Sequence, residues 1–402
     1  MCNLSCRYCF YLGKEFLYPD TSGFKMPEAV LREYTRQYLA KPGGEVTFTW
    51  QGGEPTLLGL DFYEKALSFQ EEYNTANKVV RNTLQTNGLK IDDSWAQFFR
   101  DHDFLIGLSL DGPEHIHNRY RKYKNGGDSF TQVRRGMDCL QKYDVKFNIL
   151  GCVSDYSAQF PYKIYDFYRD EAETQYWQFI PIVERHHNRD RDVTEYSVSA
   201  EQYGDFLIRI FDRWVRNDIG KISVQIFDVA FRVYLGMNAG LCLFDETCGN
   251  ALAIEHNGDL YSCDHFVETE HHLGNIGERT LNEMVALPVQ NQFGQDKKAT
   301  LPQYCRNCEV QFICNGGCPK NRFIRTPEGE PGLNYLCAGY KKFFTYIDPH
   351  MRYLAEKYKA GNTPEMMMAY IRNHPEQFVV EPKRNALCYC GSGKKYKMCC
   401  LQ

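Results

Sequence analysis

The chain has 402 residues, more than a single hydrophobic core usually accommodates, so two or more domains are expected. Hydrophobic residues make up 43% and charged residues 24% of the sequence, which excludes a mainly disordered protein. Lys and Arg (47) nearly balance Asp and Glu (51), and the net charge of -4 excludes a general electrostatic attraction to nucleic acid or to an anionic membrane.

Apolar runs in the sequence are too short to span a membrane, and no secretion signal is evident. We therefore expect a cytoplasmic protein that neither inserts into a membrane nor binds nucleic acid.

Short β-rich runs alternate with helical patterns from Glu45 to about Ile182. The expected strands are Val46–Trp50, Val80–Gln85, Phe104–Leu110, Lys146–Val153 and Tyr176–Ile180. The expected helices between them are Leu60–Tyr73, Ser94–Arg100, Phe130–Tyr143 and Pro161–Arg169. This alternation predicts an α/β fold with a parallel sheet that is curled into a full or partial barrel.

Polar segments follow three of the expected strands directly: Gln51–Pro55, Gln85–Gly88 and Ser109–Pro113. Because sites on parallel sheets lie at the carboxyl ends of the strands, we expect the chemistry there.

The pattern changes after a charged stretch at Glu184–Asp192. Helical segments are expected at Ala200–Val215 and Val224–Leu235, a hairpin around Asn257-Gly258-Asp259, and a further helical stretch at Pro349–Lys359.

Seventeen cysteines are too many for an inert core in a reducing compartment, where clustered thiols are more often metal ligands than disulfides. Only Cys139 and Cys152 stand apart from the other cysteines, and both are expected to be buried thiols. The rest form four groups: Cys2, Cys6 and Cys9; Cys242, Cys248 and Cys263; Cys305, Cys308, Cys314, Cys318 and Cys337; and Cys388, Cys390, Cys399 and Cys400.

The first group supplies three thiolates on one short loop, enough to hold three irons of a [4Fe–4S] cluster and leave the fourth iron open. A zinc site is the alternative, but structural zinc takes four ligands. The spacing of Cys2, Cys6 and Cys9, with Tyr8 before the last cysteine, resembles the signature of the radical S-adenosylmethionine superfamily. That resemblance implies that S-adenosylmethionine binds the open iron and yields an adenosyl radical.

Further segments resemble cofactor-contacting parts of that superfamily. Gly52, Gly53 and Glu54 look like its GGEP segment, which engages the methionyl ammonium, and Ser109 and Asp111 resemble positions that contact the ribose and methionyl ends. The segment from Ser109 to Pro113 and the segment from Gln85 to Gly88 can also be plain turns. We also assign Arg135 to the cofactor, with a solvated helix face as the alternative.

The second and third cysteine groups resemble the SPASM pattern of radical enzymes that act on peptides. By that resemblance, two fully ligated auxiliary [4Fe–4S] clusters store or relay electrons, with a pair of zinc ribbons as the alternative. The implied ligand sets are Cys242, Cys248, Cys263 and Cys318 for one cluster and Cys305, Cys308, Cys314 and Cys337 for the other.

Within the SPASM group, the sequence closely resembles the anaerobic sulfatase-maturating enzymes from Cys2 to about Tyr346. The matching segments are Cys9-Phe10-Tyr11, Gln51-Gly52-Gly53-Glu54-Pro55-Thr56, Ser94-Trp95, Gly107–Pro113, Tyr261-Ser262-Cys263-Asp264 and Leu273-Gly274-Asn275-Ile276. This resemblance implies a partial (β/α)6 barrel followed by the auxiliary-cluster domain. A strand normally precedes the first motif in this family, so the chain looks clipped or unusually started.

The resemblance also implies site residues and partners. Asp264 matches the family's proposed base, with an acidic turn residue as the alternative. Tyr11 and Gln51 match positions that line the peptide channel, with ordinary packing as the alternative for Tyr11. His265 stands where an aromatic residue is typical. The implied partners are an unfolded or nascent sulfatase and an electron donor such as flavodoxin or ferredoxin.

The last cysteine group resembles a SEC-C motif, in which four thiolates bind one Zn²⁺. Lys394, Lys395 and Lys397 could meet an acidic partner in protein export; a solvated basic surface is the alternative.

Together these features predict five regions. They are a radical barrel at 1–190, a helical bridge at 191–240, the auxiliary-cluster domain at 241–348, a helical linker at 349–381 and the zinc module at 382–402. The expected function is oxygen-independent conversion of a sulfatase Cys or Ser to Cα-formylglycine. The alternatives are crosslinking of a ribosomally made peptide and a non-catalytic iron–sulfur or zinc scaffold in protein export.

Overall fold

The computed structural model describes residues 1–18, 24–186, 193–378 and 395–398. The chain forms two compact units. Unit 1 consists of Met1–Leu110, Glu114–Leu150 and Cys248–Asp296; unit 2 consists of Asp111–Pro113, Gly151–Thr247 and the described part of Lys297–Gln402.

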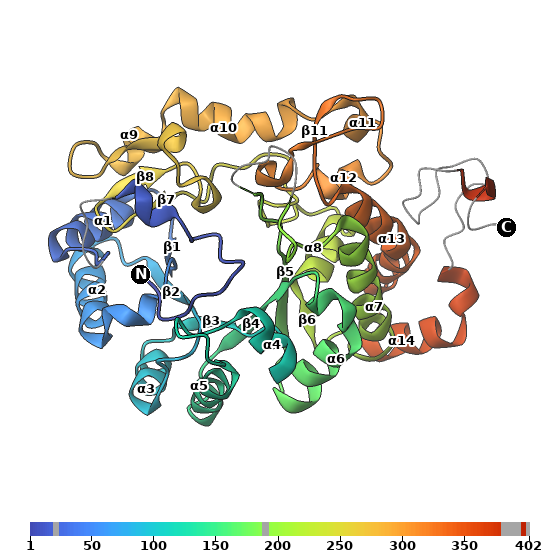
Figure 1. The fold of residues 1–402 in the computed structure, drawn as a ribbon, viewed down its shortest axis with the longest axis horizontal. Coiled ribbons are helices and arrows are strands. Elements are labelled where there is room, and N and C mark those ends of the chain that lie inside the picture. Colours follow the sequence, from blue (N-terminus) through green and yellow to red (C-terminus); the bar gives the residue numbers. More distant parts are fainter. Residues whose placement is uncertain (19–23, 187–192, 379–394, 399–402) are drawn as a thin grey trace. The chain divides into compact units, whose positions relative to one another are not determined.

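Six strands follow one another in the sheet in chain order (Figure 1). They are β1 (Glu45–Trp50), β2 (Val79–Thr86), β3 (Leu105–Ser109), β4 (Phe147–Val153), β5 (Tyr176–Pro181) and β6 (Ser223–Val224). β1 pairs in parallel with β2, β2 with β3, β3 with β4, and β5 with β6. The expected parallel α/β fold is therefore confirmed.

The core of unit 1 forms where helices cover the sheet. Its helices are α1 (Glu28–Ala40), α2 (Leu60–Tyr73), α3 (Asp93–Asp101), α4 (Glu114–Tyr120) and α5 (Phe130–Lys142). The alternating burial of β1 turns Val46, Phe48 and Trp50 into this core, where they join buried aromatics such as Tyr63 and Phe99. Such alternation is what a strand with one buried face requires.

A second, antiparallel sheet in unit 1 contains the expected hairpin. Its strands are β7 (Ala253–Ile254), β8 (Asp259–Tyr261) and β9 (His272–Asn275), followed by α9 (Leu281–Val285) and α10 (Pro288–Ala299). The side-chain amide of Gln37, on α1, contacts the segment that connects β9 to α9. It donates to the Ile276 carbonyl (3.2 Å) and accepts from the Leu281 main-chain amide (2.6 Å).

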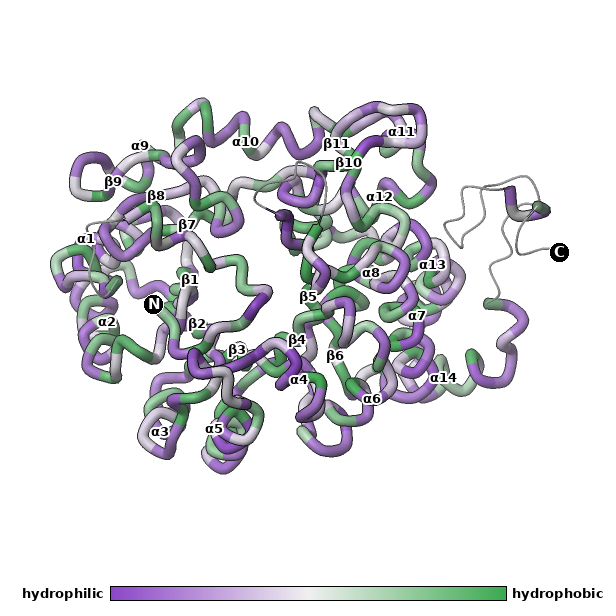
Figure 2. Tube along the Cα trace, viewed as in Figure 1, coloured by the Kyte–Doolittle hydropathy of each residue, from purple (hydrophilic) through white to green (hydrophobic). Residues whose placement is uncertain are grey.

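Unit 2 is built mainly from helices and carries the two remaining short strands, β10 (Ile324–Arg325) and β11 (Pro331–Leu333). Its helices are α6 (Pro161–Asp166), α7 (Ala200–Asn217), α8 (Gln225–Tyr234), α11 (Gln303–Arg306), α12 (Gln311–Cys314), α13 (Cys337–Lys359) and α14 (Pro364–Asn373). A capping box between Ser199 and Gln202 begins α7. Hydrophobic and hydrophilic residues alternate along the helices of this unit in Figure 2, and the buried faces of α7, α8 and α13 supply the aromatic core.

Two helices differ from the expectation. α13 begins at Cys337 and continues through Pro349, which was expected to start it. α6 ends at Asp166 and passes into a π-helical turn at Phe167–Glu171, which shortens the helix expected at Pro161–Arg169.

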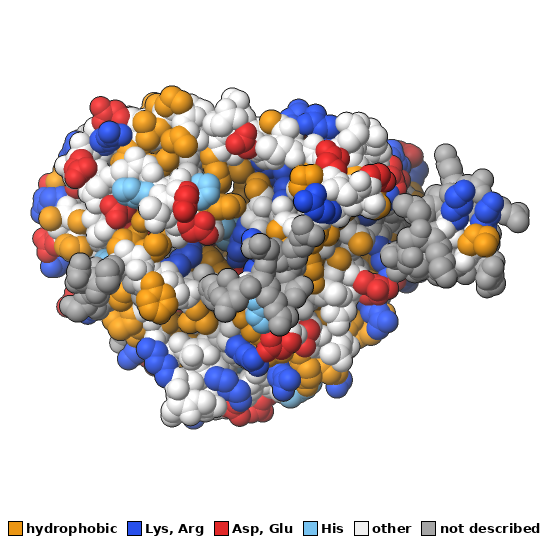
Figure 3. All heavy atoms as spheres, turned by 45° about the horizontal axis from the view of Figure 1, so that its top comes forward, with side chains coloured by type: hydrophobic (Ala, Val, Ile, Leu, Met, Phe, Trp, Pro, Cys, Tyr) orange, Lys and Arg blue, Asp and Glu red, His pale blue; other side chains and the backbone are white. Residues whose placement is uncertain are grey.

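None of the helices in the described ranges is long and apolar enough to cross a membrane. On the face drawn in Figure 3, acidic and basic side chains are interspersed, which agrees with the near balance of charges in the sequence.

Candidate active site

The loop that carries Cys2, Cys6 and Cys9 is already shaped by hydrogen bonds. The Cys9 amide donates to the Cys6 carbonyl (3.0 Å), and the Cys2 sulfur accepts from the Leu4 amide (3.4 Å) and from Nδ2 of Asn87 (3.6 Å). Burial raises the pKa of the Cys2 thiol, so without a cation at the site the thiol is held neutral. Three thiols on one folded loop, with N–H groups directed at a sulfur, fit an iron–sulfur cluster.

The segment after β1 approaches this loop closely. The Glu54 amide donates to the Met1 carbonyl (2.9 Å), next to the first cysteine. Gly53 has φ +55°, and a Cβ placed there would lie 2.2 Å from the Met1 carbonyl oxygen. Only glycine therefore allows this contact between the two segments.

The carboxylate of Glu54 is buried and holds the segments after β1 and β2 together. Oε1 accepts from the Thr56 hydroxyl (2.5 Å) and the Thr86 hydroxyl (2.7 Å), and Oε2 accepts from the Asn87 amide (2.8 Å). Burial raises the pKa of Glu54, and these hydrogen bonds lower it. Oε2 accepts one hydrogen bond from the described residues, so it keeps acceptor capacity that an ammonium could use.

The other residues that we assigned to the cofactor lie in different settings. Ser109, at the end of β3, accepts a hydrogen bond from Nε2 of Gln85 (2.9 Å). Asp111 is buried in unit 2, where its Oδ1 accepts from the Cys152 amide (2.9 Å). Arg135 is exposed on α5, 3.5 Å from Oε1 of Gln132, and its role at the cofactor stays a prediction.

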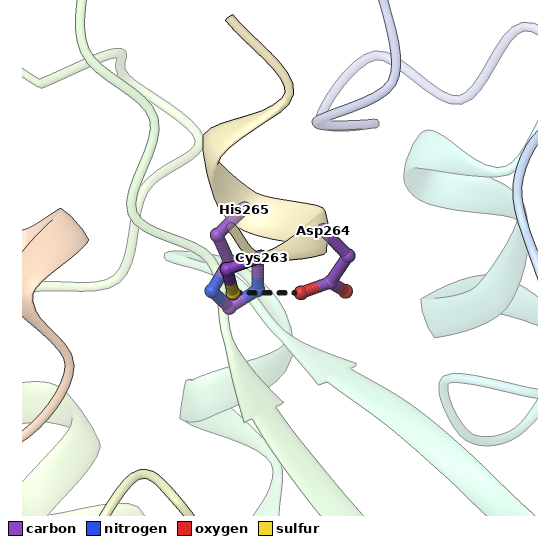
Figure 4. Close-up of side chains that lie close together, drawn as sticks. All are labelled: Cys263, Asp264 and His265. Carbon is purple, nitrogen blue, oxygen red and sulfur yellow. Dashed lines mark hydrogen bonds between the residues drawn. The ribbon is translucent and has the colours of Figure 1, made fainter. Parts of the chain in front are cut away.

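Asp264 begins a 3₁₀ turn that starts three residues after the end of β8, and its side chain lies near those of Cys263 and His265 (Figure 4). The Cys263 sulfur is 3.3 Å from Oδ1 of Asp264. Ligand atoms of Cys263, Asp264 and His265 all lie within 4.8 Å of one another. The geometry allows these side chains to share one ion, but the resemblance assigns Cys263 to an auxiliary cluster and Asp264 to proton transfer.

Gln51 and Tyr11 connect this turn to the loop of the first three cysteines. Nε2 of Gln51 donates to the Tyr11 hydroxyl (2.8 Å) and lies 3.4 Å from Oδ2 of Asp264. Burial, together with the charge of Asp264, raises the pKa of Tyr11, so its hydroxyl stays protonated. The structure thus brings together all three residues that the sequence placed at the substrate.

Lys14 also lies at this point, although the sequence analysis did not single it out. Its Nζ donates to the Asp264 carbonyl (2.5 Å) and lies 5.0 Å from the ring centroids of Phe10 and Tyr11. The motif contains no signal for Lys14, because its partner is 250 residues away in the chain. Asn87, by contrast, lies in one of the polar segments after the strands.

Four cysteines of unit 2 lie close enough to affect one another electrostatically. Burial raises the pKa of Cys314 to about 12, and the charges of Cys308 and Cys305 contribute. Burial also raises the pKa of Cys337, with contributions from the other three thiols. These four are the set expected for one auxiliary cluster. Because a buried group of thiols is costly to ionise without a cation, their chemistry fits a metal cluster.

The other expected ligands divide between the units, with Cys248 and Cys263 in unit 1 and Cys242 and Cys318 in unit 2. The expected zinc ligands Cys388, Cys390, Cys399 and Cys400 lie outside the described residues, as does Lys394.

Comparison with known families finds three matching models. Residues 1–154 match the radical SAM superfamily, residues 242–309 match an iron–sulfur cluster-binding domain named SPASM, and residues 384–402 match the SEC-C motif.

Comparison with whole proteins finds long matches. The chain is 40% identical to the serine-type anaerobic sulfatase-maturating enzyme of Bacteroides thetaiotaomicron over 387 residues, covering 93% of each. It is 34% identical to the cysteine-type enzyme of Clostridium perfringens over 89% of this chain and 96% of that one. A solved structure of native anSMEcpe with bound AdoMet and Kp18Cys peptide is similar with a TM-score of 0.81 and 34% identity, covering 89% of this chain and 96% of that one.

Proposed function

The chain belongs to the family of anaerobic sulfatase-maturating enzymes, and from this membership we propose that it oxidises a Ser or Cys side chain of a sulfatase to Cα-formylglycine. The observation that carries the proposal is the convergence of Gln51, Tyr11 and Asp264 beside the loop of Cys2, Cys6 and Cys9. A scaffold that only binds metal would not need a base at this place.

As a member of this family, the protein uses S-adenosylmethionine and iron–sulfur clusters. Together these supply a radical that removes a hydrogen atom from Cβ of the target and a path by which one electron leaves. The residues that would hold the first cluster are Cys2, Cys6 and Cys9, with Gly52, Gly53 and Glu54 at the methionyl ammonium. Ser109 and Asp111 would contact the rest of the cofactor. The two auxiliary ligand sets would hold one [4Fe–4S] cluster each.

The protein's own residues would then complete the oxidation. The Asp264 carboxylate accepts the proton of the target hydroxyl or thiol as one electron departs, which leaves a C=O or C=S bond. A serine gives the aldehyde directly, whereas a cysteine gives a thioaldehyde that water hydrolyses with release of hydrogen sulfide. Gln51, which contacts both Tyr11 and Asp264, would hold the base in place, and Gln51 and Tyr11 would line the position of the target.

Two further components support this chemistry. We propose an electron donor of the flavodoxin or ferredoxin type, because the first cluster must be reduced from outside. We also propose that Cys388, Cys390, Cys399 and Cys400 bind one Zn²⁺, as the similarity of residues 384–402 to the SEC-C motif suggests. An acidic partner of the export machinery is the proposed ligand of this tail.

The proposal can be tested by anaerobic co-expression of this chain with a sulfatase, followed by labelling of the sulfatase with a hydrazide that reacts with aldehydes. Labelling should require the target Ser or Cys and should disappear when Cys2, Cys6 and Cys9 are all replaced by Ala. Equal labelling with this triple variant would contradict the proposal.

A further inference from the structure

A short segment that follows the first cysteine motif contacts the turn that carries Asp264. We call residues 10–18 the strap. Three of its side chains, four residues apart, meet three positions around the turn. The Phe10 ring lies edge-on to the His265 ring (5.4 Å between centroids), Lys14 donates to the Asp264 carbonyl (2.5 Å), and the Tyr18 hydroxyl donates to the Tyr261 hydroxyl (2.8 Å).

Lys14 makes the central one of these three contacts, and it is the charged residue among the three. The ammonium group donates to the Asp264 main-chain carbonyl and so fixes the backbone of the turn, while the carboxylate lies within 3.4 Å of Gln51 and 3.3 Å of Cys263. Its position over the Phe10 and Tyr11 rings, 5.0 Å from both centroids, holds the ammonium in place by cation–π attraction.

The turn is short, and its far end is held by the Phe266 ring, which packs against His271 and Phe293. It is a three-residue 3₁₀ turn, Asp264–Phe266, with no fully buried residue. Its N-cap, Cys263, makes no side-chain capping hydrogen bond. A base on such a short, partly exposed turn needs an outside contact to keep its carboxylate within reach of the proton it accepts.

We propose that Lys14 is a positioning residue for the base Asp264, and that the strap links the loop of the first cysteine motif to the base-bearing turn. This inference rests on the proposed function. Its consequence is that Lys14 controls whether hydrogen-atom removal is followed by product formation, while it leaves peptide binding unchanged.

The test compares Lys14→Met, Lys14→Arg and the matched control Lys25→Met, which alters an exposed lysine of the same unit. Each reconstituted protein is incubated anaerobically with S-adenosylmethionine, dithionite and a serine peptide. For Lys14→Met we expect the ratio of aldehyde to 5′-deoxyadenosine to fall by about tenfold, as loss of a charge-assisted hydrogen bond would produce. Lys14→Arg should recover most of this ratio, because its guanidinium can still donate and stack.

Two readouts separate positioning from other roles. Hydrogen–deuterium exchange of the holoenzyme should show faster exchange around residues 263–266 in Lys14→Met and no change in Lys25→Met. The KM for the peptide should stay constant while kcat for aldehyde falls. If Lys14→Met loses iron, Lys14→Gln takes its place, since an amide can donate the same hydrogen bond without charge, and it should give a ratio between those of Met and wild type.

An unchanged ratio and unchanged exchange in Lys14→Met would overturn the proposal, as would a raised KM with a normal kcat, which would assign Lys14 to peptide binding. Failure of the wild type and Lys25→Met to form any aldehyde would refute the proposed function instead.

Discussion

At the scale of single residues, Asp264 is held by contacts from three segments of unit 1. Its carboxylate meets Cys263 and Gln51, and its carbonyl accepts from Lys14. The sequence assigned Asp264 as the base through its resemblance to the family's proposed base, and this role stays a proposal. It could not predict Lys14, since nothing in the local pattern distinguishes this lysine from a solvated one.

Replacement of Asp264 by Asn should separate the two halves of the reaction. Asn keeps the shape and the contact with Gln51 but cannot accept the target's proton, so we expect aldehyde formation to fall by about 100-fold or more. Release of 5′-deoxyadenosine should partly survive. Both products can be quantified by mass spectrometry from the same anaerobic reaction, and a full aldehyde yield would remove Asp264 from the mechanism.

His350 gives a pH dependence to the stability of unit 2. It is buried on α13 among the rings of Tyr346, Phe211 and Phe378, and this burial lowers its pKa to about 4. In the unfolded chain the His350 imidazole has a pKa of about 6.5. Above this pH the imidazole is neutral in both the folded and the unfolded chain, so burying it costs no stability through protonation. As the pH falls from there towards 4, only the unfolded chain gains the proton, so up to about 3 kcal/mol of stability is lost.

His350→Phe should therefore reduce the difference in unfolding midpoint between pH 7 and pH 5. Anaerobic urea unfolding followed by circular dichroism measures this difference. The exposed His102→Gln should retain the wild-type pH dependence; the same result for His350→Phe would contradict the assignment.

At the scale of elements, the sequence predicted the parallel strands and most helices of the sheet because their periodicity is strong. It did not predict α1, because polar residues interrupt the apolar face of this helix. One of them, Gln37, is buried and bonds to Leu281. It placed the start of α13 too late, because a proline usually begins a helix, whereas here packing of the long buried face continues the helix through Pro349. Tertiary contacts decided both cases.

The close approach of Gly53 to Met1 predicts a specific defect in Gly53→Ala. The new Cβ would collide with the Met1 carbonyl and displace the chain next to Cys2. We expect loss of iron from the first cluster and weaker binding of S-adenosylmethionine, measured by iron analysis and equilibrium dialysis.

Gly59→Ala is the matched control for this variant. Gly59 also has positive φ (+83°), but a Cβ there would meet nothing within 4 Å. Alanine is strained by the positive φ at both positions, so iron loss in both variants would show that strain and not the contact with Met1 is responsible.

At the scale of the whole molecule, the candidate site draws on distant parts of the sequence. Residues 248–296 belong to the same compact unit as the first cysteine motif, whereas the remaining described residues of the expected 241–348 domain belong to unit 2. Motif spacing predicted cluster ligands in both stretches, but it carries no information on which stretch belongs to which unit. The bounds of the five expected regions stay predictions.

The C-terminal tail should be separable from the oxidation chemistry. In a chain that ends at Phe378, we expect the single zinc to be lost while the iron content stays at about 12 per chain, as three [4Fe–4S] clusters require. Inductively coupled plasma mass spectrometry gives both values. Zinc that persists without the tail would place the zinc site elsewhere.

The most direct test of the central claim uses a peptide containing Ser-x-Pro-x-Arg with deuterium on the serine Cβ. Anaerobic incubation with the reconstituted protein, S-adenosylmethionine and dithionite should transfer deuterium to 5′-deoxyadenosine and convert the serine to an aldehyde, with a parallel result for the cysteine peptide. Formation of unlabelled 5′-deoxyadenosine with both peptides intact would contradict the account.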